Sequence, residues 1–285
     1  KEFIIKEKID LLIVGPEKPI VDGIFDYLRS VFTLEELIII APSKIGGALE
    51  GSKKFAKEFM EKYKIPNAKY ETFNKNKFNE AISYLKNLTP PYVLKADGLA
   101  AGKGVVISSN IIEAEKALQK MLIENQFGDA SNTVLIEEFL DGIELSVFVL
   151  TDGKDYKILP VAKDYKRIGE GDTGLNTGGM GSVSPPSFVN AKLMKKIEEN
   201  IIKPTIQGLQ KENIEYNGFI FFGLINVKGE PKVIEYNARL GDPETQSVLP
   251  RIESDFLELL ISTKNAEQFK NFEVREKDTT CISTI

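Results

Sequence analysis

The stretch Ile9–Ala41, IDLLIVGPEKPIVDGIFDYLRSVFTLEELIIIA, predicts a strand, a helix and a second strand. Ile9–Val14 is a short apolar run that glycine and proline end, and Leu37–Ala41 is a second run of the same kind. Between them, Val21–Val31 has apolar side chains at helical spacing. This alternation predicts part of a doubly wound α/β unit.

Strands and helices continue to alternate toward the C-terminus. Ser52 predicts the start of a helix that runs to about Tyr63. We further expect strands at Tyr92–Ala96, Val105–Ser108, Val134–Phe139 and Glu144–Leu150, helices at Ile112–Asn125, Leu193–Gln210 and Asp255–Lys264, and a hairpin of Phe219–Asn226 with Lys232–Asn237. Residues 163–186 are rich in Gly, Asp, Asn and Pro, so we expect a long ordered loop there.

The composition is that of a globular protein of about two domains. The 285 residues include 37 basic and 42 acidic side chains, and the net charge of −5 disfavours a nucleic-acid-binding surface. No apolar run approaches the length needed to span a membrane, and no secretory signal pattern is present. We therefore expect a cytoplasmic protein that binds neither nucleic acid nor membrane. Both ends run through expected folded units, which predicts a fragment of a longer chain.

Histidine is absent, and Cys281 is the single cysteine. These counts exclude an internal disulfide framework, a zinc site of several cysteines, and any triad or metal site that uses histidine. A metal site in this chain must therefore use oxygen ligands, which favours Mg²⁺ or Mn²⁺.

The segment KADGLAAGKG (Lys95–Gly104) follows an expected buried strand. Its glycines let the backbone approach a ligand closely, and its two lysines supply positive charge. These features indicate a phosphate-binding loop, although the Walker pattern is absent. The alternative is a plain connection between strands with solvated lysines. Lys95 favours phosphate binding, because a lysine that ends an apolar run needs an anionic partner.

The segment EYN (Glu235–Asn237) lies within an expected strand. Side chains alternate along a strand, so Glu235 and Asn237 share one face. A carboxylate next to an amide oxygen suits Mg²⁺ held between protein and phosphates. The alternative is a half-exposed strand with polar residues in water, and this pair alone favours that alternative.

Three further segments combine charge with glycine. RLGDPETQ (Arg239–Gln246) is a charged turn, EEFLDGIE (Glu137–Glu144) joins two expected strands, and DTGLNTGGMG (Asp172–Gly181) is costly to order. Strand-edge backbone groups in the second can bind an adenine edge, and its last carboxylate can bind ribose hydroxyls. The length and polarity of the third are typical of a binding loop. Taken singly, each segment is also compatible with an ordinary surface turn or loop.

Taken together and in this order, the segments closely resemble the glycinamide ribonucleotide synthetase (phosphoribosylamine–glycine ligase) family of the ATP-grasp superfamily. The resemblance covers nearly the whole chain, and RLGDPETQ is its most family-specific part. It includes Ile9–Ile24, Leu49–Met60, Val93–Ile107, Val134–Val149, Gly171–Pro185 and Lys232–Gln246.

The resemblance implies an α/β and α+β multidomain protein with an ATP-grasp fold and part of an N-terminal doubly wound α/β domain. Residues 1–46 would be the remnant of that domain, and 47–68 with 139–275 the main ATP-grasp domain. Residues 69–138 would form the lid subdomain, and 276–285 the start of a truncated C-terminal domain.

The resemblance also implies roles for individual residues. Catalytic roles fall to Arg239 and Lys95, and metal ligation to Glu235 and Asn237. The residues implied to bind ATP are Lys53, Lys95, Gly102, Lys103, Gly104, Glu137, Glu138, Phe139, Leu140 and Glu144. Those implied to bind the other substrates are Asp164, Asn176, Thr177, Gly178, Gly179, Met180, Arg239, Gly241, Asp242, Pro243 and Glu244.

The implied reaction joins glycine to 5-phosphoribosylamine with ATP and Mg²⁺ or Mn²⁺, through a glycyl phosphate, in purine biosynthesis. The resemblance also implies a monomer. The family commonly has histidine where Tyr165 stands, which leaves the contribution of Tyr165 to substrate contacts open. The alternatives are another ATP-grasp ligase or a carboxylase that activates bicarbonate, and a non-catalytic nucleotide-binding fragment. RLGDPETQ argues against the carboxylase, and the intact lysines argue against a decayed site.

Overall fold

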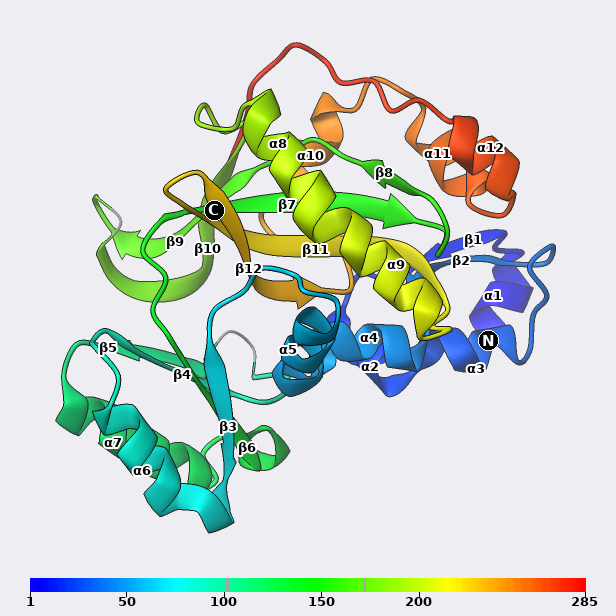
Figure 1. The fold of residues 1–285 in the computed structure, drawn as a ribbon. Coiled ribbons are helices and arrows are strands. Elements are labelled where there is room, and N and C mark those ends of the chain that lie inside the picture. Colours follow the sequence, from blue (N-terminus) through cyan, green and yellow to red (C-terminus); the bar gives the residue numbers. More distant parts are fainter. Residues whose placement is uncertain (101–102, 172) are drawn as a thin grey trace.

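A computed structural model of the chain describes residues 1–100, 103–171 and 173–285. For residues 175 and 176 it describes the backbone alone. The described chain forms a larger body around a six-stranded sheet and a smaller unit around a four-stranded sheet, which we call the lid for brevity (Figure 1). Among the helices of the described residues, none is long and apolar enough to cross a membrane.

The sheet of the body has the strand order β1-β2-β11-β7-β8, and β12 also pairs with β11. The strands are β1 (Leu11–Ile13), β2 (Ile38–Pro42), β7 (Ile143–Thr151), β8 (Tyr156–Ile158), β11 (Tyr216–Val227) and β12 (Glu230–Asn237). Among the described strand pairs of this sheet, β1 and β2 are parallel and the others are antiparallel. The two strands predicted on either side of Val21–Val31 pair in parallel, as a doubly wound unit requires, and the predicted hairpin of β11 with β12 is confirmed.

Both faces of this sheet are buried, and β7 shows why. Leu145, Val147 and Val149 enter one apolar core, whereas Phe148 and Leu150 enter another on the opposite face. The first face packs against α2 (Glu17–Asp22), α3 (Ile24–Arg29), α4 (Lys44–Gly51), α5 (Lys53–Lys62), α8 (Ala191–Ile197) and α9 (Lys203–Lys211). The second packs against α10 (Thr245–Val248), α11 (Phe256–Ser262) and α12 (Ala266–Asn271).

Two predicted helices differ from their expected form. The helix expected at Val21–Val31 is broken at Gly23, whose φ of 92° is left-handed, so two short helices replace it. The helix expected at Leu193–Gln210 contains a π-helical turn, Glu198–Ile202, between α8 and α9. A short helix, α1 (Glu2–Glu7), precedes the first strand.

The prediction of a loop over residues 163–186 was wrong. The segment forms β9 (Lys163–Gly169) and β10 (Thr173–Ser184), and β10 also pairs with β13 (Cys281–Thr284). These strands lack the apolar alternation that reveals a half-buried strand, and the register between β9 and β10 shifts twice. Backbone pairing joins these strands, and the buried hydroxyls of Ser182 and Ser184 donate to the carbonyl oxygens of Pro243 and Val161.

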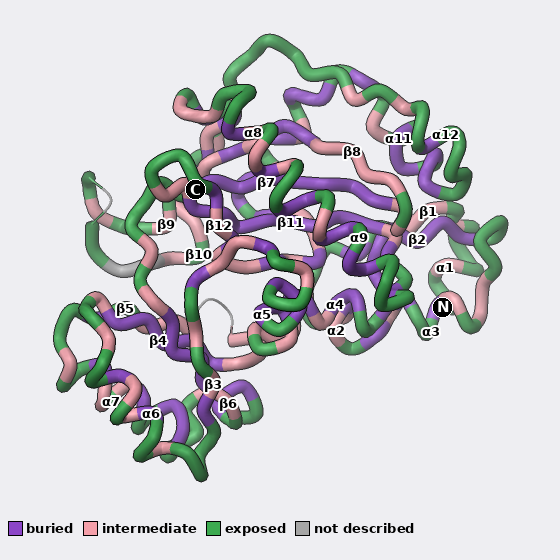
Figure 2. The backbone as a smooth tube through the Cα atoms, viewed as in Figure 1, coloured by how far each residue is buried: buried purple, intermediate pink, exposed green. Residues whose placement is uncertain are grey.

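The lid has its own core. Its sheet has the order β3-β6-β4-β5, made of β3 (Tyr70–Asn74), β6 (Thr133–Glu137), β4 (Tyr92–Ala96) and β5 (Val105–Ser108). The helices α6 (Phe78–Lys86) and α7 (Ile111–Leu122) cover one face of it. Leu85, Leu118 and Ile136 are fully buried there and belong to a cluster separate from the two cores of the body. Figure 2 shows the burial of these elements along the backbone.

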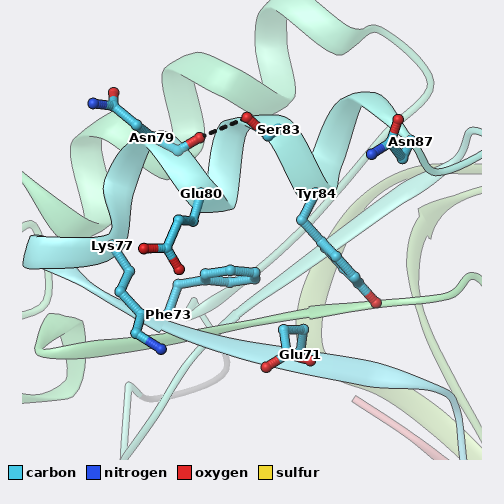
Figure 3. Close-up of a pocket in the computed structure, with 8 residues that line it drawn as sticks. All are labelled: Glu71, Phe73, Lys77, Asn79, Glu80, Ser83, Tyr84 and Asn87. Carbon is cyan, nitrogen blue, oxygen red and sulfur yellow. Dashed lines mark hydrogen bonds between the residues drawn. The ribbon is translucent and has the colours of Figure 1, made fainter.

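The lid also has an open hollow between α6 and β3 (Figure 3). Glu71, Lys77 and Glu80 lie around it, with the ring of Tyr84 at one end. The hydroxyl of Ser83 donates to the carbonyl oxygen of Asn79 in the preceding helical turn, 3.0 Å away. The 3₁₀ turn Lys75–Lys77 leads into α6, and two more 3₁₀ turns lie at Gly128–Ser131 and Leu249–Arg251.

Candidate active site

A cavity of about 840 Å³ lies where the body meets the lid, between β12 and α5 on one side and β4 and β6 on the other. Most residues singled out from the sequence line it: Lys53, Lys95, Gly104, Glu137, Glu138, Phe139, Leu140, Glu144, Asp164, Thr177, Gly178, Glu235, Asn237, Arg239, Gly241, Asp242 and Glu244. Lys103, Gly179, Met180 and Pro243 lie outside that lining. Gly102 and the side chain of Asn176 fall outside what the structure describes.

Glu235 and Asn237 lie on one face of β12 and border the cavity, as the strand period requires. Tyr236 between them points into the core, where its hydroxyl lies 3.0 Å from that of Thr205. Burial raises the pKa of Glu235. The positive charges of Lys166, Lys95, Lys53 and Arg239 lower it by more than burial raises it, so the pKa is below its ordinary value. The Glu235 side chain is therefore an anion at neutral pH.

Two lysines reach the cavity from different parts of the chain. Lys95 lies on β4 of the lid, and its amine is 3.0 Å from Oε2 of Glu137. Lys53 begins α5 of the body and donates to the carbonyl oxygen of Gly98, 2.9 Å away, in the loop after β4. Burial lowers the pKa of Lys53, with the charge of Glu235 opposing that effect. The two ammonium groups thus approach the same space from the two lobes.

The extended segment between β6 and β7 offers backbone groups to the cavity. The N–H of Glu138 donates to the carbonyl oxygen of Lys69, 2.9 Å away. Phe139 and Leu140 follow, and the backbone of neither makes a hydrogen bond with another described residue. Glu144 at the start of β7 has its carboxylate 3.7 Å from the amine of Lys166.

The opposite end of the cavity contains buried acids. Glu244 is 3 % exposed and accepts a hydrogen bond of 2.9 Å from the hydroxyl of Ser146. Burial raises the pKa of Glu244, and the charge of Asp164 adds to the effect. Arg239 pairs with Glu50 at 2.9 Å, and Oε2 of Glu50 accepts from the N–H of Ala238 at 2.8 Å. Arg239 is therefore held in place by an acid of α4.

Sequence reasoning missed four of the charged residues that line this cavity: Glu17, Glu50, Lys57 and Lys166. The amine of Lys166 lies 3.3 Å from Asp164. Burial lowers the pKa of Lys166, but the surrounding carboxylates, Glu235 first, raise it above its ordinary value on balance. Lys57 lies one helical turn after Lys53, and this spacing is the signal that could have identified it.

Oxygen donors for a metal ion are present but few. Among the described residues, no group of three acidic or thiol side chains is arranged to hold a metal ion. Glu235 and Asn237 provide one charged and one neutral oxygen on the same strand face. Such a pair fits a Mg²⁺ or Mn²⁺ ion that takes its remaining ligands from water and phosphate oxygens.

Comparison with known proteins places these features in a family. The model of the family described as "Phosphoribosylglycinamide synthetase, ATP-grasp (A) domain" matches residues 51–245. The chain is 47 % identical over 283 residues to a phosphoribosylamine–glycine ligase of Fusobacterium nucleatum and 46 % identical over 262 residues to that of Escherichia coli. The aligned parts are 98 % and 92 % of this chain, but only 65 % and 60 % of those proteins.

Solved structures agree with the fold. A crystal structure of phosphoribosylamine–glycine ligase from Thermotoga maritima superposes with a TM-score of 0.81 at 31 % identity, covering 97 % of this chain and 80 % of that one. A biotin carboxylase of Campylobacter jejuni superposes with a TM-score of 0.71 at 18 % identity, covering 98 % and 59 %, and shares the fold alone. The chain has the ATP-grasp fold and belongs to the phosphoribosylglycinamide synthetase family.

Proposed function

We propose that the chain is the ATP-grasp part of a ligase that joins glycine to 5-phosphoribosylamine at the expense of ATP. One observation supports this most strongly. Two lysines from separate lobes, Lys53 and Lys95, border the same cavity as the carboxylate of Glu235 and the amide of Asn237. Cations on one side and oxygen ligands on the other suit a triphosphate whose repulsion a bound metal ion reduces. The names of the relatives support the choice of glycine and phosphoribosylamine.

The proposed chemistry has two steps. A carboxylate oxygen of glycine attacks the γ-phosphorus of ATP, the bond from that phosphorus to the bridging oxygen breaks, and glycyl phosphate and ADP form. The amine of phosphoribosylamine then attacks the carbonyl carbon, the bond to the phosphate oxygen breaks, and the amine loses a proton. The protein contributes positioning and charge rather than a covalent nucleophile.

Most of the lining residues that were expected from the sequence have a proposed part in these steps. Lys53, Lys95 and the loop that includes Gly104 hold the phosphates, and the backbone of 138–140 holds the adenine edge. Glu144 holds the ribose. Glu235 and Asn237 would hold Mg²⁺ or Mn²⁺, which neutralises triphosphate charge when bound. Arg239 would stabilise the oxyanion of the second step. Asp164, Thr177, Gly178, Gly241, Asp242 and Glu244 would contact the other substrates, and Gly179, Met180 and Pro243 would support that end.

The domain division stays part of the proposal. We take residues 69–138 as the lid, 47–68 with 139–275 as the main domain, 1–46 as part of a preceding α/β domain and 276–285 as the start of a following one. The boundaries at 69 and 138 lie next to the first and last strands of the lid sheet, β3 and β6. A cytoplasmic monomer is the proposed form.

The test is ADP release by this chain with Mg-ATP, glycine and freshly made phosphoribosylamine, with bicarbonate as the alternative substrate. Release that requires both substrates is expected, and Glu235→Ala should reduce it by a factor of roughly 100 or more. Glu230→Ala, on the same strand but at its exposed start, should not. Release stimulated by bicarbonate instead would favour the carboxylase, and nucleotide binding with no stimulated release would favour a silent binding module.

A further inference from the structure

Lys57 is a buried amine to which the proposed chemistry gives no task. It lies on α5 and is 2 % exposed. Its three N–H groups have three acceptors: Oδ1 of Asn67 at 3.2 Å, the carbonyl oxygen of Ala68 at 3.1 Å and Oε2 of Glu137 at 3.4 Å. The ring of Tyr70 lies 5.2 Å from the amine and adds a cation–π contact. A buried ammonium with every donor satisfied remains charged at moderate cost.

Glu137 joins Lys57 to the phosphate end of the cavity. Its Oε2 atom contacts both Lys57 and Lys95, the latter at 3.0 Å. The three side chains are each less than one-tenth exposed. The other oxygen, Oε1, is buried and has no hydrogen-bond partner among the described residues. One carboxylate thus faces two ammonium groups, and the cluster has a net charge of +1.

We propose that Lys57 is a positioning residue for the triphosphate, which acts by neutralising Glu137 so that Lys95 keeps an uncompensated positive charge for the ATP phosphates. Without Lys57, the charge of Glu137 would be balanced by Lys95, and this buried pair would have zero net charge. Phosphate oxygens would then have to compete with that carboxylate for the amine of Lys95. This inference rests on the proposed function, because it concerns how the same site binds ATP.

The place of Lys57 in the fold supports the same role. Asn67 and Ala68 belong to the segment by which the chain enters the lid after α5, and Glu137 ends the strand by which it leaves. The amine of Lys57 therefore contacts both crossings between body and lid. Lys95 is fixed in turn, since its amine also donates to the carbonyl oxygen of Ile234 on β12 at 3.4 Å.

The test compares Mg-ATP dissociation constants, measured by titration calorimetry, for the wild-type chain, Lys57→Met and the double variant Lys57→Met/Glu137→Gln. Removing one charge from this cluster should weaken ATP binding roughly tenfold or more. The double variant removes the carboxylate as well and restores the net charge, so it should regain most of the lost affinity. Lys54→Met, an exposed lysine on the same helix, is the matched control and should bind as the wild type does.

The recovery in the double variant separates charge balance from a merely structural role. If Lys57 had only a structural role, ATP binding would be weak in both the single and the double variant, or the melting temperature would fall while the affinity stayed unchanged. Either result would overturn the inference. Should Lys57→Met fail to fold, Lys57→Gln keeps a donor toward Ala68 and removes only the charge, with the same expected loss. A wild-type chain that binds no ATP refutes the proposed function itself, whereas tight wild-type binding that Lys57→Met leaves unchanged refutes only this inference.

Discussion

At the scale of single residues, the cavity is a set of opposite charges that hold one another in place. Arg239, to which the family resemblance assigns a catalytic role, is paired with Glu50. Burial raises the pKa of Glu50, and Arg239 opposes that rise. Glu137 is likewise shared between two lysines. The types of side chain in the site were predictable from the sequence, but the pairing was not, because each pair joins segments far apart in the chain.

Lys57 makes a testable contribution to the pH dependence of stability. Burial lowers its pKa from 10.5 to about 8, although the charge of Glu137 opposes that effect. Between pH 8 and 10.5 the unfolded chain therefore binds more protons at this residue than the native protein does, and the free energy of unfolding should rise with pH. The full effect of Lys57 is about 3 kcal/mol.

The measurement is urea unfolding of wild type and Lys57→Met at pH 7 to 10. The difference between the two curves removes the titration of all other groups. The wild type should gain stability relative to the variant as the pH rises. If the difference in the free energy of unfolding stays constant, or if the wild type loses stability relative to the variant as the pH rises, the pKa of Lys57 is not lowered in the native protein.

At the scale of elements, strands with apolar alternation were predictable and strands built from glycine and polar residues were not. The strands at Tyr92–Ala96 and Glu144–Leu150 were predicted within a residue or so of β4 and β7. β9 and β10 were not predicted, because their sequences lack apolar alternation and only their pairing with neighbouring strands identifies them as strands. Much of the site lies on well-patterned elements, which is why sequence reasoning placed Glu235 and Asn237 on the correct strand face.

Gly208 on α9 lies against the aromatic rings of Phe59 and Tyr63 at the end of α5. A Cβ atom there would lie 2.5 Å from the ring of Phe59 and 2.8 Å from that of Tyr63. Gly208→Ala should therefore destabilise the protein by about 1–3 kcal/mol through overpacking, despite the better helix propensity of alanine. Gln207→Ala, on the exposed face of the same helix, is the control for propensity. Thermal unfolding checks both, and a Gly208→Ala variant as stable as the control would mean that α9 can shift outward freely.

At the scale of the whole molecule, the lid is a unit with its own apolar core, and the ion pairs Lys57–Glu137 and Lys232–Glu138 join it to the body near the cavity. Leu118→Ala should remove about 2–5 kcal/mol from the local stability of the lid. Hydrogen exchange should then accelerate for amides of β3 to β6, while amides of β7 and β11 keep their wild-type protection. Equal acceleration in both sheets would show that lid and body open together.

The pairing of β2 with β11 has a consequence for synthesis on the ribosome. Pro42 pairs with Tyr216 and Ala41 with Asn217, so β2 meets this partner only after the lid and the strands that follow it have emerged from the ribosome. Until then the end of β2 at Ala41 and Pro42 lacks its partner strand, while Ile38 to Ile40 are already able to pair with β1. Uncovered apolar edges attract other nascent chains, and pairing over such sequence distance is slow. Slowed translation between the lid and β11 should therefore reduce the yield of folded protein and increase its dependence on chaperones.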